Sequence, residues 1–156
     1  MEDKGFHSIE YTQKEALIFR QLCHLATEWG EAWWAYRRAC SEYSDVPMAG
    51  REGKAVEEVA DIMIVAYDLA GIAGVDIPDD PYPTGYTPQQ IMPLMAAIAQ
   101  TCDEYRKYGT LEGLKIVLRY AQETITAWGD NPMEAVERKM AKNRLRPQRY
   151  GTQEAA

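Results

Sequence analysis

Apolar residues recur along this chain at the spacing of an α-helix, and no segment shows the alternation expected of a strand. Runs of periodic positions are separated by clusters of glycine, proline and other turn residues. The pattern predicts five helices, over about residues 12–43, 54–73, 93–108, 111–128 and 132–146. Five helices without strands predict an all-α fold, a helical bundle, and the 156 residues predict a single domain over 1–156.

Capping and breaking signals set the predicted boundaries. The segment TQKE at 12–15 is a capping box that opens the first helix, and Asn131 followed by proline and glutamate opens the last one. A similar capping signal at 87–90 precedes Pro93, near which the third helix is expected to start. The segment 74–88 holds four prolines and two glycines, which predicts an irregular connection.

The predicted helix over 54–73 combines an apolar composition with acidic residues. Its apolar positions leave no broad polar face, so the helix is expected to be buried on nearly every side. An ionised carboxylate in such a place is costly unless a partner compensates it. At 100° per residue, one stripe of this helix holds Lys54, Glu58, Asp61, Val65 and Asp68.

A second polar stripe lies on the first predicted helix, where spacings of 3, 4 and 3 stack Gln21, His24, Glu28 and Glu31. If the two stripes face each other, four carboxylates converge, and such a group must be protonated or bind cations. Mg²⁺ is the expected cation, with Mn²⁺ as a substitute, because hard ions prefer oxygen ligands. A di-iron centre is disfavoured, since neither histidine of the chain lies in a Glu-x-x-His motif. The alternative is that the acids are solvated surface residues.

The last predicted helix contributes positive charge. Lys139, Asn143 and Arg146 share one face at spacings of 4 and 3, so they can clamp phosphates or simply complement the dipole of their own helix. Trp29 forms an i,i+4 pair with Trp33 beside the acidic stripe, where it can stack on a base or pack in the core.

Composition restricts the classes of function. A net charge of −7 argues against binding to a nucleic acid polymer. Three cysteines without ligand spacing argue against a disulfide framework or a zinc site and favour a reducing compartment. Without a signal peptide pattern near the first residues or a long uninterrupted apolar segment, the chain is expected to be soluble and cytoplasmic, with no membrane partner.

The ordered set EWGE, 26 intervening residues, EVAD, and later KMAKNRLRPQRYG resembles the MazG-type family of all-α nucleoside triphosphate pyrophosphohydrolases. The resemblance covers about residues 10–75 and 131–151, whereas 76–130 comprises a loop and two extra helices without a motif of the family. It implies an Mg²⁺-dependent enzyme that converts a (d)NTP to the monophosphate and pyrophosphate, as in housecleaning of nucleotide pools. Family members assemble from two or more chains, so a homodimer or homotetramer is expected.

The resemblance also implies roles for individual residues. The metal ligands would be Glu28, Glu31, Glu58 and Asp61. Lys139, Asn143 and Arg146 would contact the substrate, and the stripe residues His24 and Lys54 and the aromatic Trp29 are further candidates. Glu31 is the favoured catalytic base, since it can hold metal and water together, with Glu28 beside it. Some relatives have an acid where this chain has Thr27, and Glu57 is a possible replacement.

Three alternatives stay open at this stage. Within the same superfamily, the chain could be a phosphoribosyl-ATP pyrophosphohydrolase or a dimeric dUTPase-like enzyme. In a different class, it could be a non-catalytic helical interaction module whose acids only solvate the surface.

Overall fold

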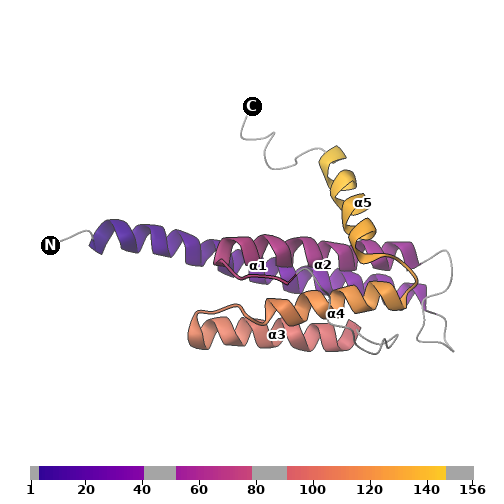
Figure 1. Ribbon diagram of the computed structural model, residues 1–156, viewed down its shortest axis with the longest axis horizontal. Coiled ribbons are helices and arrows are strands. Elements are labelled where there is room, and N and C mark those ends of the chain that lie inside the picture. Colours follow the sequence, from indigo (N-terminus) through magenta and orange to yellow (C-terminus); the bar gives the residue numbers. More distant parts are fainter. Residues whose placement is uncertain (1–3, 41–51, 79–90, 147–156) are drawn as a thin grey trace.

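The computed structural model describes residues 4–40, 52–78 and 91–146, and within these ranges the chain forms helices and no strand (Figure 1). This confirms the predicted all-α fold. The helices are α1 (Lys4–Ala39), α2 (Glu52–Ala73), α3 (Ile91–Tyr108), α4 (Leu114–Ala127) and α5 (Pro132–Leu145). No helix in the described ranges is both long enough and apolar enough to cross a membrane.

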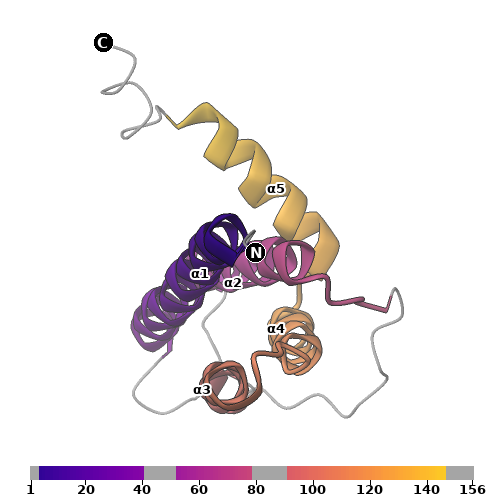
Figure 2. The ribbon, with the colours of Figure 1, turned by 90° about the vertical axis from the view of Figure 1, so that its left-hand side faces the viewer.

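Helix α2 occupies the centre of the bundle. It packs along α1 and also contacts α4 and α5, while α3 lies against α4 and, less extensively, against α1 (Figures 1 and 2). Side chains of α2 such as Ile62, Met63 and Leu69 have no exposed surface. The three neighbours of α2 explain its predominantly apolar sequence, because each of them needs an apolar face to pack against.

The start of α1 differs from the prediction. The helix begins at Lys4, so the capping box at 12–15 lies inside it. Between Lys4 and Thr12 the chain has no proline, and its single glycine costs only about 1 kcal/mol of helix stability, which is too little to end a helix. The predicted continuation of α1 to residue 43 and the capping signal at 87–90 lie outside the described residues.

The turn between α3 and α4 also shifts a boundary. Helix α4 begins at Leu114 instead of Leu111, because the Glu104 carboxylate accepts the backbone N–H groups of Glu112 and Gly113, both at 2.8 Å. These hydrogen bonds hold the intervening residues in a turn. By contrast, α5 begins as predicted, with the Asn131 side chain accepting the backbone N–H of Glu134 at 3.0 Å.

Candidate metal centre

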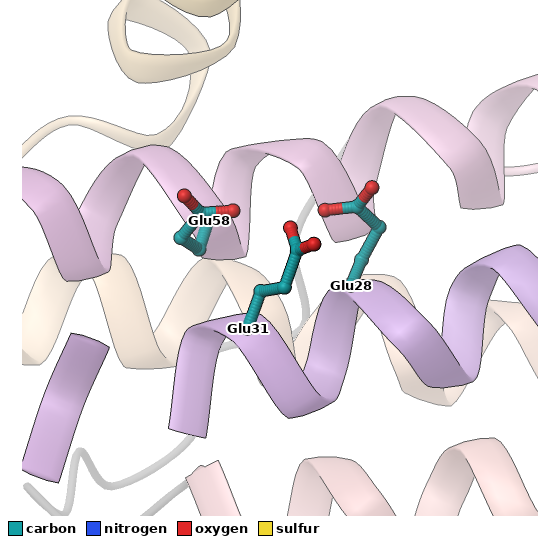
Figure 3. A group of neighbouring side chains, drawn as sticks. All are labelled: Glu28, Glu31 and Glu58. Atoms are coloured by element: carbon teal, nitrogen blue, oxygen red, sulfur yellow. The ribbon is translucent and has the colours of Figure 1, made fainter. Parts of the chain in front are cut away.

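Three acidic side chains converge where α1 faces α2. Glu28 and Glu31 come from one stripe of α1 and Glu58 comes from α2, and one carboxylate oxygen of each lies within 4.8 Å of the others. Figure 3 shows the three side chains extending into the space between the two helices. Glu58 is 6% exposed. The two predicted acidic stripes therefore do face each other, although 26 residues of sequence lie between Glu31 and Glu58.

The fourth predicted ligand, Asp61, has a different environment. One of its carboxylate oxygens binds the Lys139 ammonium at 2.9 Å, and the other accepts a hydrogen bond of 3.4 Å from the Asn143 amide. Lys139 is only 2% exposed, although it is a lysine. The two α5 residues predicted to bind substrate thus hold Asp61 in this structure, and Asp61 lies beside the group of three glutamates instead of within it.

Other candidates on the two stripes pair with the acids. The His24 ring lies 2.9 Å from Glu28 and the Lys54 ammonium 3.3 Å from Glu58. Glu57, the possible replacement base, pairs with Lys142 at 2.6 Å. Partial burial opposes ionisation of Glu57, but the hydrogen bond and charge of Lys142 outweigh it and lower the pKa of this carboxyl. A low pKa makes Glu57 a weak proton acceptor.

The two remaining residues of the α2 stripe, Asp68 and Val65, have different environments. Asp68 is exposed and bonds to Gln21 on α1, whereas Val65 is buried in the core. The contact between Gln21 and Asp68, together with the proximity of Glu31 and Glu58, shows that α1 and α2 run antiparallel.

Glu28 has the strongest electrostatic perturbation in the group. Burial is the main cause, followed by the negative charges of Asp61, Glu31 and Glu58, and together they raise the pKa of Glu28 to about 8. Its Oε2 atom is buried without a hydrogen-bond partner in the described part of the chain. At neutral pH this carboxyl therefore keeps a proton until a cation compensates its charge.

An open cavity of about 930 Å³ surrounds the acids. Helices α1, α2 and α5 contribute its lining, which consists of His24, Thr27, Glu28, Glu31, Trp34, Arg38, Lys54, Glu58, Asp61, Lys139 and Arg146. Most of the predicted site residues are therefore brought to one place. The volume of this cavity is near the upper end of the range for small-molecule sites, so the cavity is larger than a single ion requires.

Trp29 is not in this lining. Its ring stacks on Trp33 at 5.8 Å, and its indole N–H donates to the Ile91 carbonyl at 2.8 Å. The structure therefore places Trp29 in the packing of α1 against α3, the second of its two predicted roles, and outside the lining of this cavity. The tryptophan at the cavity is Trp34.

Sequence reasoning also missed Thr27 as a lining residue and Arg38 altogether. The signal was available, because continuing the stripe of His24, Glu28 and Glu31 by helical steps of three and four leads to Trp34 and Arg38.

The donor set fits a hard divalent cation. All three converging groups offer carboxylate oxygens, which Mg²⁺ and Mn²⁺ prefer, and the unpartnered buried oxygen of Glu28 would gain a partner.

Comparison of the chain with models of protein families, with curated proteins and with solved structures found no match.

Proposed function

We propose that this protein is a Mg²⁺-dependent nucleoside triphosphate pyrophosphohydrolase of the MazG type, which hydrolyses a (d)NTP to the (d)NMP and pyrophosphate. The observation that carries the proposal is the convergence of Glu28, Glu31 and Glu58 from two helices at one cavity. Acidic side chains that only solvate the surface would not be expected to converge across a helix interface, where Glu58 is only 6% exposed.

The acidic residues of the site have different roles in this reaction. Glu28 and Glu58, the less exposed acids, hold the cation. A bound divalent cation would supply positive charge to the triphosphate and lower the pKa of the attacking water. Glu31 is exposed at the cavity, so it can accept a proton from that water.

Positive side chains compensate the substrate in a protein with a net charge of −7. Lys54, Lys139 and Arg146 line the same cavity as the acids. A triphosphate that binds there meets the exposed Lys54 and Arg146, while Lys139 stays buried against Asp61, and these charges offset the repulsion from the rest of the molecule.

The experiment is a comparison of Glu58→Gln with wild type in Mg²⁺-dependent release of pyrophosphate from a panel of natural and modified (d)NTPs. The amide is nearly isosteric but cannot supply the charge that the cation requires, so we expect release to fall to background while the helical circular dichroism is kept. Glu137→Gln, which changes an exposed glutamate of α5, is the matched control. Near-normal turnover by folded Glu58→Gln would contradict the proposal.

A further inference from the structure

The cavity wall changes in character along α1. The lining residues of this helix form one continuous stripe, from His24 through Glu28, Glu31 and Trp34 to Arg38. Since each residue advances a helix by 1.5 Å, the backbone of Arg38 lies about 10 Å beyond that of Glu31. The acids therefore occupy the middle of the stripe, and an arginine lies at its C-terminal end.

A second cation lines the cavity toward this same end. Because α2 is antiparallel to α1, Lys54, one turn before Glu58, lies alongside the turn of α1 that follows Glu31. Helix α5 crosses α2 at a steep angle, with the pairs Lys139–Asp61 and Lys142–Glu57 at the crossing (Figures 1 and 2). Arg146, which follows α5, lines the cavity from this third element. We call Arg38 and Lys54, with Trp34 beside them, the cationic end of the cavity.

The guanidinium group of Arg38 is available to a ligand. Both basic side chains of the cationic end are exposed, and Lys54 pairs with Glu58. Within the described ranges Arg38 has no ion pair with an acid. The opposite end of the α1 stripe offers the neutral hydroxyl of Thr27 and the ring of His24. The wall that α1 and α2 form is therefore asymmetric in charge about its acids.

We propose that the cationic end binds the two terminal phosphoryl groups of the substrate, which leave as pyrophosphate, with Arg38 as a phosphate-binding residue. This orientation rests on the proposed function. The terminal phosphates carry most of the negative charge of a nucleoside triphosphate and the nucleoside carries none, so charge complementarity directs the phosphates to the cations. The planar guanidinium of Arg38 suits two phosphate oxygens at once. The nucleoside then lies toward Thr27 and His24.

Product binding tests the orientation, because each product reports on one end of the cavity. Binding of pyrophosphate and of a nucleoside monophosphate is measured by calorimetry in the presence of Mg²⁺ for Arg38→Met and Arg37→Met. Arg37 is the matched control, since it is adjacent, is exposed, lies over the Trp33 ring at 5.7 Å and does not line the cavity. Arg38→Met should weaken pyrophosphate about tenfold or more, as expected for a lost charge-assisted hydrogen bond, and leave the monophosphate unchanged.

Two results would overturn the orientation: pyrophosphate binding in Arg38→Met equal to that in Arg37→Met, or a loss of monophosphate binding as large as the loss of pyrophosphate binding. Wild-type turnover is assayed in parallel. If wild type hydrolyses (d)NTPs and Arg38→Met binds pyrophosphate normally, only the orientation fails. If wild type hydrolyses no triphosphate of the panel, the proposed function fails, and wild-type affinity for pyrophosphate then reports on the cationic end alone.

Fluorescence gives a readout that does not depend on the arginine variant. Trp34 is 66% exposed at the cationic end, whereas Trp29 donates its indole N–H to the Ile91 carbonyl. Pyrophosphate should change the emission of wild type and of Trp29→Phe but not that of Trp34→Phe. An equal change in Trp34→Phe would place the anion away from the cationic end.

Discussion

The carboxyl group of Glu28 couples the site to pH at the scale of a single residue. Its pKa in the folded protein is about 8, against an ordinary value of 4.5. Between these two values the folded state keeps a proton that the unfolded state has lost. The free energy of unfolding therefore falls as pH rises through this window, and the loss is complete above about pH 8.

The corresponding prediction compares Glu28→Gln with wild type in urea denaturation between pH 5 and about pH 8.5. The glutamine cannot ionise, so the variant should lack the part of the decline that Glu28 causes. Glu137→Gln should keep the wild-type profile. Parallel profiles for wild type and Glu28→Gln would show that Glu28 ionises normally.

Lys139 and Asp61 form an ion pair whose contribution to the free energy of unfolding can be tested by one substitution. Lys139→Met keeps the length of the side chain but leaves the largely buried Asp61 carboxylate facing the neighbouring acids. Breaking such a pair should cost about 3 kcal/mol of unfolding free energy. Lys142→Met, which removes the more exposed partner of Glu57, should cost less than about 1 kcal/mol. Equal losses in the two variants would argue against a special role of the buried pair.

At the scale of elements, most helix boundaries follow from local signals, whereas one boundary depends on a contact between elements. The Asn131 cap lies next to the turn it serves, so the start of α5 was predictable. The start of α4 was not, because it depends on Glu104, which belongs to α3. Likewise, the indole of Trp29 reaches the first described residue of α3, a partner 62 residues away.

The hairpin of α3 and α4 gives a prediction at this scale. A Cβ atom on Gly113 would lie 2.5 Å from the Thr101 hydroxyl oxygen, and Thr101 is fully buried and donates to the Ala97 carbonyl. Gly113→Ala should therefore lower the unfolding free energy by about 1–3 kcal/mol. Gly71→Ala, whose new methyl meets nothing within 4 Å in the last turn of α2, should instead raise it, by no more than about 0.5–1 kcal/mol. Stability measured by urea denaturation checks both signs.

At the scale of the whole molecule, the site joins three helices that are remote in sequence. A cation held by α1 and α2 links them in the folded state alone, so Mg²⁺ should raise the melting temperature. The increase should be larger at about pH 8 than at about pH 6, because the cation must displace the proton of Glu28. A non-catalytic interaction module would show no response to Mg²⁺ at either pH. Association of two or more chains stays a prediction, for which analytical ultracentrifugation is the measurement.

The sequence by itself determined the helical class of the fold and the composition of each helix face. Both follow from the rotation of 100° per residue in an α-helix, so the face on which a residue lies can be calculated from the local sequence alone. It was thus possible to predict that Glu28 and Glu31 share a stripe and that Glu58 belongs to a mostly buried helix.

Only the tertiary structure decided which faces meet. The packing of the helices determines that the three glutamates lie together and that Lys139 binds Asp61. It also determines that Trp34, and not Trp29, lines the cavity. Packing is the outcome of many weak contacts between residues far apart in the chain, and periodicity within one helix carries no information about the face of its neighbour.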